Sequence, residues 1–138
     1  MSNAALAEWF KQDRPPRRKR DGNAEARVQA AVVEWIRTVA PQCLVFAVPN
    51  GGLRSKSEAA RLKWTGVLAG VPDLCVIAPG GRAFFLECKA PIGGVVSPDQ
   101  WAVIDRLRGL GSPTAIVRSI DDARAAFQEW GIETREVK

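Results

Sequence analysis

Three charged residues stand at the ends of two apolar segments in the middle of the chain. Asp73 opens the segment 73–78, and Glu87 and Lys89 close the segment 82–89. If the second segment is a strand, Glu87 and Lys89 share one face, with their Cα atoms about 7 Å apart. Burial of a carboxylate and an ammonium beside a sheet is costly unless the two groups pair or bind a metal ion.

A tight turn at Gly80-Gly81 joins the two segments and predicts a β-hairpin. In that hairpin Asp73 lies opposite the end of the second strand, close to Glu87 and Lys89. Two carboxylates and a lysine suit phosphodiester hydrolysis with Mg²⁺, which binds carboxylate, water and phosphate oxygens and lowers the pKa of bound water. Lys89 would orient or deprotonate that water, or stabilise developing negative charge. The alternative is a salt bridge at the strand end, with Asp73 as a turn residue.

The composition narrows the chemistry that is available. The chain of 138 residues contains no histidine and no tyrosine. This excludes histidine-based nucleophilic catalysis, histidine-ligated zinc and a tyrosine recombinase or topoisomerase mechanism. Cys43, Cys75 and Cys88 lie far apart in apolar segments, so we expect small buried hydrophobes and neither a disulfide framework nor a zinc cluster. The groups that remain available for catalysis are carboxylates, lysine and a hard metal ion.

Positive charge is concentrated in two stretches of a chain whose formal net charge is +5. Residues 11–20 form the first. Such clusters attract polyanions, because neutralised phosphates release counterions, although a basic stretch can also be a solvated surface. Asn50 begins a glycine turn that could bring backbone N–H groups to a phosphate. Candidate nucleic-acid contacts are therefore Asn50 and the second basic stretch, Arg54, Lys56, Arg61 and Lys63.

Hydrophobic periodicity and turn residues predict the elements that position these groups. The expected order, in residue numbers, is helix 24–39, strand 43–48, helix 55–65, strands 73–78 and 82–89, a helix from 98, strand 114–117 and helix 121–130. A hairpin followed by a strand–helix–strand unit predicts an α/β (α+β) fold, with a mixed central sheet of about four strands flanked by helices.

Local sequence signals refine two of these helices. Ser55 with Glu58, and Ser97 with Gln100, have the spacing of capping boxes. Pro98 suits the first position of its helix. On that helix the residues expected to face inward are Trp101, Ile104 and Leu107 or Leu110.

The length suits one folded domain, which we place at residues 23–138 after a basic N-terminal arm at residues 1–22. Apolar segments fall short of the roughly 20 residues that cross a bilayer, and the start of the chain lacks a signal-peptide pattern. We therefore expect a soluble cytoplasmic protein, bacterial or in a phage-infected host cell, without a membrane partner.

Taken together, Pro72-Asp73 and Glu87-Cys88-Lys89 resemble the signature of the PD-(D/E)XK nuclease superfamily. More narrowly, the stretch from Glu25 to Trp130 resembles a VRR-NUC domain, the virus-type replication and repair nuclease module. The remaining matching pieces are Glu25 with Gln29, Val48-Pro49-Asn50-Gly51-Gly52, Gly66 through Leu74, and Ser97-Pro98-Asp99-Gln100.

This resemblance implies a restriction-endonuclease-like core and a role for each matching residue. Asp73, Glu87 and the backbone carbonyl of Cys88 would be metal ligands, and Lys89 the catalytic lysine. Glu25 would bind a metal directly or through water, although it could instead only complement the helix dipole. Gln100 would lie beside the lysine, although it equally fits the capping box.

The resemblance also implies an endonuclease that hydrolyses DNA with Mg²⁺ or Mn²⁺. It would act on branched or Holliday-junction-like DNA in replication, repair or recombination, as a symmetric homodimer. Leu6, Trp9 and Phe10 could supply the interface, and Trp64 and Trp101 are interpreted as core or interface residues, not as base-stacking platforms. The alternatives are a non-catalytic nucleic-acid-binding module of the same fold and a restriction-type duplex nuclease, and RNA stays open as a substrate.

Overall fold

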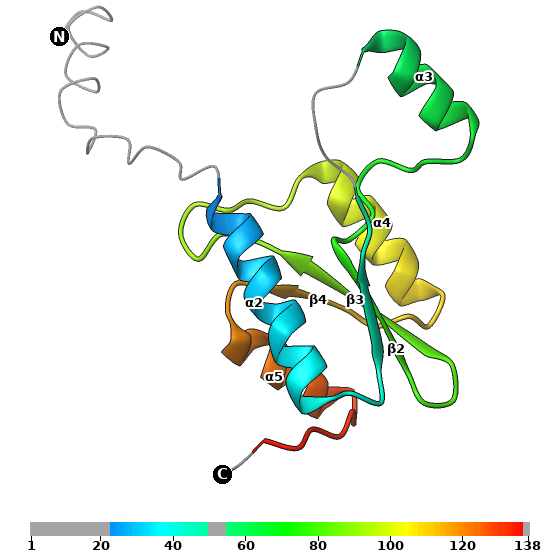
Figure 1. The fold of residues 1–138 in the computed structure, drawn as a ribbon. Coiled ribbons are helices and arrows are strands. Elements are labelled where there is room, and N and C mark those ends of the chain that lie inside the picture. Colours follow the sequence, from blue (N-terminus) through cyan, green and yellow to red (C-terminus); the bar gives the residue numbers. More distant parts are fainter. Residues whose placement is uncertain (1–22, 50–54, 137–138) are drawn as a thin grey trace, which may run out of the picture.

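The centre of the fold is a sheet whose strands are β1 (Leu44–Ala47), β2 (Leu74–Ala78), β3 (Arg82–Cys88) and β4 (Thr114–Val117) (Figure 1). The computed structural model describes residues 23–49 and 55–136. The strands lie in the order β1-β2-β3-β4; β1 pairs antiparallel with β2 and β2 with β3, whereas β4 runs parallel to β3. The predicted mixed sheet is confirmed.

Four helices of the described chain surround this sheet: α2 (Ala24–Val39), α3 (Lys56–Trp64), α4 (Pro98–Gly109) and α5 (Ile120–Glu129). In Figure 1, α2 and α5 lie on one face of the sheet, α4 lies on the other, and α3 projects away from both layers. The predicted order of elements is confirmed, with ends shifted by at most one residue. None of these helices combines the length and the apolar character needed to cross a membrane.

The turn between β2 and β3 is the predicted glycine turn. Ala78 pairs with Arg82, and Gly80 and Gly81 between them have φ values of +85° and +74°. Glycine takes these left-handed conformations without a steric penalty, so the turn fixes the register of the hairpin. That register pairs Leu74 with Leu86, which leaves the residue before β2 opposite the end of β3.

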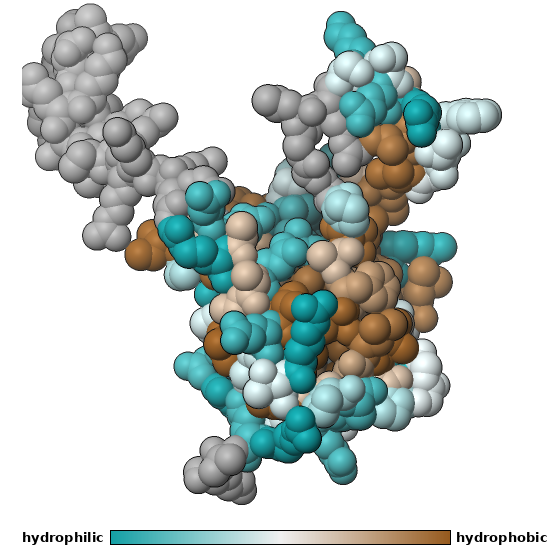
Figure 2. Space-filling model, viewed as in Figure 1, coloured by the Kyte–Doolittle hydropathy of each residue, from teal (hydrophilic) through white to brown (hydrophobic). Residues whose placement is uncertain are grey.

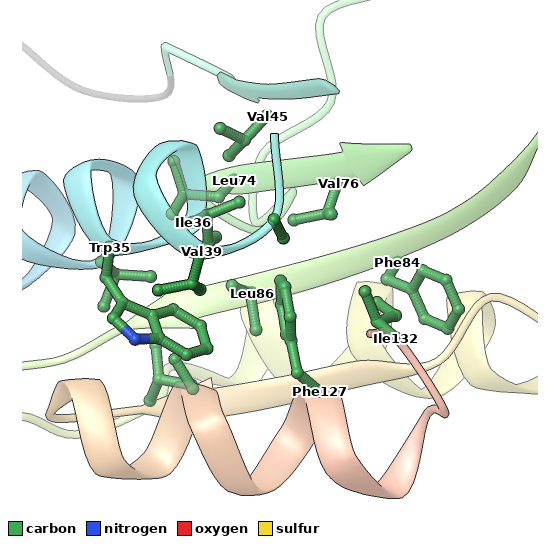
Figure 3. Close-up of a cluster of buried hydrophobic side chains, with 14 of the residues drawn as sticks. Trp35, Ile36, Val39, Val45, Leu74, Val76, Phe84, Leu86, Phe127 and Ile132 are labelled. Atoms are coloured by element: carbon green, nitrogen blue, oxygen red, sulfur yellow. The ribbon is translucent and has the colours of Figure 1, made fainter. Parts of the chain in front are cut away.

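The face of the sheet beneath α2 and α5 forms the hydrophobic core (Figure 3). Val32, Trp35, Ile36 and Val39 recur at helical spacing and are buried, as the periodicity of the sequence predicts. Phe127 of α5 is fully buried, with its ring centroid 5.1 Å from that of Trp35. This face supplies most of the apolar burial.

The opposite face is only partly covered. Ile104 of α4 is fully buried, as expected, but Trp101 is 41% exposed and Leu110 is 66% exposed. The expectation that Trp101 faces inward is therefore wrong, and Leu110 lies outward as well. Leu44 and Phe46 of β1 point to this same face and are also exposed. Periodicity identified the inward stripe of α4 but not how little of the sheet that helix covers.

The three cysteines are free thiols, as expected. Cys75 and Cys88 are buried, and Cys43 is partly buried. Burial raises the pKa of the Cys75 thiol above its ordinary value. These residues are packed as small hydrophobes.

Candidate metal centre

Carboxylates from three separate elements meet at one edge of the sheet. Glu25 comes from the first turn of α2, Asp73 directly precedes β2, and Glu87 is near the end of β3. One carboxylate oxygen from each lies within 4.8 Å of one from each of the others. The hairpin argument brought Asp73 and Glu87 together, whereas only the resemblance pointed to Glu25.

Backbone contacts on both sides hold Asp73 in place. Its Oδ2 accepts a hydrogen bond of 2.8 Å from the backbone N–H of Cys88, and its carbonyl accepts one of 2.8 Å from Val48. Through these two hydrogen bonds Asp73 links the end of β1 to the end of β3. A charge-assisted hydrogen bond from a backbone N–H group fixes the orientation of a carboxylate.

Glu87 is the most deeply buried member of the cluster, with no exposed surface. Its Oε1 accepts a hydrogen bond of 2.8 Å from Nε2 of Gln100 and lies 3.4 Å from Nζ of Lys89. Its Oε2 is buried without a hydrogen-bond partner among the described residues. Burial of a carboxylate oxygen without a hydrogen bond is energetically costly. Buried polar atoms without a partner are therefore rare in folded proteins, and one that persists suggests a bound ion, a water molecule or a functional role.

The electrostatics of Glu87 point the same way. Its pKa is raised from 4.5 to about 7, mainly by burial and also by the nearby Asp73 carboxylate, while Lys89 acts in the opposite direction. A carboxylate in this position gains from an added positive charge. A divalent cation would supply that charge to Asp73 and Glu87 together.

Lys89 lies among the carboxylates and not in the apolar core, with only 5% of its surface exposed. Its Nζ is 3.4 Å from Oε1 of Glu87 and 3.8 Å from Oε1 of Glu25. The loop after β3 folds back over it: a Cβ at Gly94 would lie 2.9 Å from the nitrogen of Ala90 and 3.1 Å from the Cβ of Lys89. A glycine at position 94 thus permits the close cover that buries the lysine.

Gln100 caps its own helix and also contacts the acidic cluster. Its backbone N–H donates to Oγ of Ser97 at 3.2 Å, and its Oε1 accepts from the N–H of Ser97 at 2.9 Å, which completes the capping box of α4. The remaining donor, Nε2, reaches Glu87. The helix cap therefore fixes the amide whose other end contacts the acidic cluster, and it contacts the same carboxylate oxygen that Lys89 approaches.

Gly70 is a positioning residue, which the sequence analysis included only within the matching stretch Gly66 through Leu74. Its φ is +89°, and a Cβ at this position would lie 2.5 Å from the carbonyl oxygen of Asp99 and 2.9 Å from the nitrogen of Gln100. The loop that leads to Asp73 thus presses directly on the first turn of α4. Its sequence signal, a glycine three residues before the aspartate, does not reveal which segment the loop touches.

The side chain of Cys88 belongs to the core and not to the cluster. Its sulfur is fully buried among apolar residues, and burial raises the pKa of the thiol to about 12, with Asp73 and Glu87 adding to the shift. A thiol that stays protonated is a poor ligand for a hard cation. A contribution from Cys88 would come from its backbone.

The predicted nucleic-acid contacts are less completely placed. Asn50 and Arg54 lie outside the described residues. Lys56, Arg61 and Lys63 are exposed on α3, and no contact described here links them to the carboxylates. Trp64, at the end of α3, is 86% exposed and is not a core residue, which corrects that half of its interpretation. A helical pattern with one tryptophan looks the same whether or not the helix packs on the sheet.

The donor set of the cluster indicates which cation it suits. Carboxylate oxygens without histidine or accessible thiolate ligands match the preferences of hard cations such as Mg²⁺ and Mn²⁺. The carboxylate of Glu87 belongs to a group that also contains Asp73 and Glu25, and its Oε2 has no hydrogen-bond partner among the described residues. The residues present therefore fit a divalent cation.

Comparison with known proteins gives a consistent result. The family model of the VRR-NUC domain matches residues 3–121. A solved structure described as a VRR_NUC domain protein has a TM-score of 0.64 and 25% sequence identity, covering 82% of this chain and 93% of that one. A second, described as a VRR_NUC domain, has a TM-score of 0.58 and 25% identity, covering 78% and 97% respectively. Among curated proteins, none matches the chain. The matched range begins within residues 1–22, so the domain boundary at residue 23 stays a prediction.

Proposed function

The chain belongs to the VRR-NUC domain family, a nuclease-type domain family, and on that premise we propose that it is a metal-dependent endonuclease that hydrolyses DNA phosphodiester bonds. One observation carries the proposal: the carboxylate of Glu87 is grouped with those of Asp73 and Glu25, and its Oε2 is buried without a hydrogen-bond partner among the described residues. A purely structural salt bridge with Lys89 would not need three carboxylates at one point or leave one oxygen unsatisfied.

In this proposal Mg²⁺ or Mn²⁺ is held by Asp73, Glu87, Glu25 and the backbone carbonyl of Cys88. When bound, the ion lowers the pKa of a water molecule and offsets negative charge on the phosphate. Gln100 orients the carboxylate of Glu87 by donating to its Oε1, while Oε2 has no hydrogen-bond partner among the described residues. The N–H of Cys88 orients Asp73 in the same way.

Lys89 is the cationic group of the proposed mechanism. Its ammonium is held 3.4 Å from Glu87 and is almost fully buried, so it occupies a defined position before substrate binds. From there it can donate a hydrogen bond to a phosphate oxygen or orient the attacking water. Because this side chain is already ordered by burial, little side-chain entropy is lost when it acts.

The finer parts of the proposal rest on the resemblance to VRR-NUC nucleases. We propose branched or Holliday-junction-like DNA as the substrate and a symmetric homodimer as the active form. A two-fold dimer would present two sites to two strands, which suits paired incisions. The rival functions are a binding module that does not cut and a restriction-type nuclease that cuts plain duplex.

One experiment separates these functions. Purified protein is incubated with labelled four-way junction, flap, single-stranded and linear duplex DNA, in Mg²⁺, Mn²⁺ or EDTA. The proposal expects cleavage that requires the metal and prefers the junction. Equal cutting of the linear duplex would favour the restriction-type alternative. Binding without cutting under every condition would favour the binding module.

Two carboxylates on α2 provide a matched pair of variants. Glu25 lies within the cluster, whereas Glu34 is exposed on the same helix. Glu25→Gln should lower cleavage and weaken the rise in melting temperature that Mn²⁺ causes, and Glu34→Gln should change neither. Equal effects of the two substitutions would contradict the assignment of Glu25 to the metal.

A further inference from the structure

The segment that carries α3 leaves and rejoins the sheet at the edge where the carboxylates lie. β1 and β2 are antiparallel neighbours, with Ala47 paired to Leu74, and the N–H of Val48 donates to the carbonyl of Asp73. The chain between these residues is therefore inserted directly beside Asp73. Figure 1 shows α3 projecting from this end of the molecule.

Folding alone does not explain why α3 is there. None of its nine residues is buried in the part of the chain that the structure describes. A helix this short is marginal in water without a packed face, and its described stabilisation is local: an N-cap at Ser55 and hydrogen bonds from Thr65 to its last turn. Helices of this kind usually gain stability from a surface on which they dock.

The exposed apolar groups of this projection are large. Trp64 is 86% exposed, and Val67 and Leu68, which follow it, are 44% and 57% exposed. Tryptophan is highly buried in most proteins, so a side chain this open indicates a binding role more often than a packing role. Figure 2 shows polar and apolar surface side by side on the projection.

The charge around Trp64 indicates the partner. Arg61 and Lys63 precede it by three residues and one residue, Lys56 begins the helix, and all three are exposed, against a single acid at Glu58. Cations beside an exposed aromatic ring suit a nucleic-acid strand, because phosphates bind the cations and bases stack on the ring. A two-fold contact between two copies would instead place this positive patch against itself.

We propose that the α3 projection is a nucleic-acid-binding arm in which Trp64 stacks on an unpaired base while Arg61 and Lys63 bind the adjacent backbone. The inference rests on the proposed function for the class of ligand. It adds a preference that the metal chemistry does not require: substrates with unpaired bases bind more tightly than a blunt duplex, because stacked pairs offer the indole no free base.

The test measures binding in EDTA, so that it is independent of cleavage. Wild type, Trp64→Ala and Trp64→Phe are titrated into fluorescein-labelled single-stranded DNA and blunt duplex. Base stacking on an aromatic ring is worth about 1–3 kcal/mol, so Trp64→Ala should weaken single-strand binding about 5- to 150-fold. Duplex binding should change less than about twofold, and Trp64→Phe should restore most of the loss.

Two further variants isolate the stacking contact. Leu110→Ala removes an apolar side chain that is also exposed, at the far end of α4, and should leave both affinities unchanged. Lys63→Gln should weaken binding to both DNAs alike and reduce the salt dependence by about one phosphate contact. Melting curves should match wild type for Trp64→Ala, because the indole is not part of the core.

Several results would overturn the inference. They are an unchanged single-strand affinity of Trp64→Ala, an equal loss on single strand and duplex, or conversion of a dimer to a monomer in sedimentation with DNA binding intact. The last result would identify α3 as a contact between copies. If the protein cleaves DNA but Trp64→Ala binds normally, only the arm is wrong; if binding depends on Trp64 but no metal supports cleavage, only the proposed function is wrong.

Discussion

The two faces of β3 meet different environments although their residues alternate along one strand. Phe84, Leu86 and Cys88 lie in the core formed with α2 and α5. Glu87 and Lys89, on the other face, are just as inaccessible, but their partners are carboxylates and an amide. One face therefore stabilises the fold, and its apolar burial offsets the cost of holding two charged groups on the other.

This comparison makes a first prediction about the core face. Phe127→Ala should lower the free energy of unfolding by about 3–5 kcal/mol, because it removes a fully buried ring that packs against Trp35. Urea denaturation followed by circular dichroism measures the loss. The variant that remains folded should cut DNA as wild type does. A loss of cleavage in fully folded protein would contradict the division of labour between the faces.

The second prediction concerns the other face. Glu87→Gln should reduce cleavage about 10²- to 10³-fold, because it removes the charge that holds the cation. In EDTA the melting temperature should stay the same or rise, since a neutral amide is easier to bury than a carboxylate. Melting curves with and without Mn²⁺ check this, and stabilisation by Mn²⁺ should disappear. Retained metal stabilisation would show that the ion binds elsewhere.

A third prediction concerns the connection between α4 and the site. In Gln100→Glu the new side chain can still accept from the N–H of Ser97, but it cannot donate to Glu87 and places a second carboxylate beside it. Cleavage should fall about 10- to 100-fold, the usual cost of losing a partner of a metal ligand. A pH–rate profile should move to higher pH, whereas a purely structural role for Gln100 would leave the profile in place.

A fourth prediction concerns the pH dependence of stability. The pKa of Glu87 is raised from 4.5 to about 7, mainly by burial, so the folded, metal-free protein holds this proton in a pH range where the unfolded chain has released it. The contribution of Glu87 to stability is therefore full below about pH 4.5 and is lost as the pH rises through 7. Melting temperatures in EDTA from pH 5 to 8 should fall more steeply for wild type than for Glu87→Gln. Parallel curves would contradict the raised pKa.

The smallest expected effect comes from two equivalent serine caps. Ser97 begins α4 and Ser119 begins α5, and each accepts a hydrogen bond from the backbone N–H three residues later. Each serine-to-alanine change should cost about 1 kcal/mol of stability. Ser97→Ala should also lower cleavage, because Gln100 loses part of its support, whereas Ser119→Ala should not. Thermal melting and initial rates together distinguish the two caps.

The sequence was sufficient to predict those parts of the fold and of the site that depend on the alternation of side chains along a strand and on the residues of the turns. Period two placed Glu87 and Lys89 on one face, and the glycine turn set the register that brings Asp73 to Cys88. Both signals lie within a short stretch of chain. The capping box at Ser97 was also readable, because its two residues are three apart.

The parts that were missed depend on tertiary contacts between distant segments. Periodicity assigns an inward stripe to α4 but cannot say where its cover of the sheet ends, so Trp101 was misplaced. A glycine at position 70 predicts a turn whether its loop faces solvent or packs against the backbone of Asp99, so the sequence could not reveal this contact. The exposure of α3 was hidden for the same reason, since a cap and a helical pattern do not report the presence of a docking surface.

The way α3 is inserted has a consequence for the engineering of this domain. Because the insertion begins and ends at neighbouring backbone positions, Val48 and Asp73, its length can change at a small entropic cost that grows only logarithmically. No buried contact within the described chain would be lost if the helix were exchanged for another segment. A different segment grafted between these two positions should therefore leave the sheet and its carboxylate cluster intact, which makes the insertion a practical place to introduce a new binding surface.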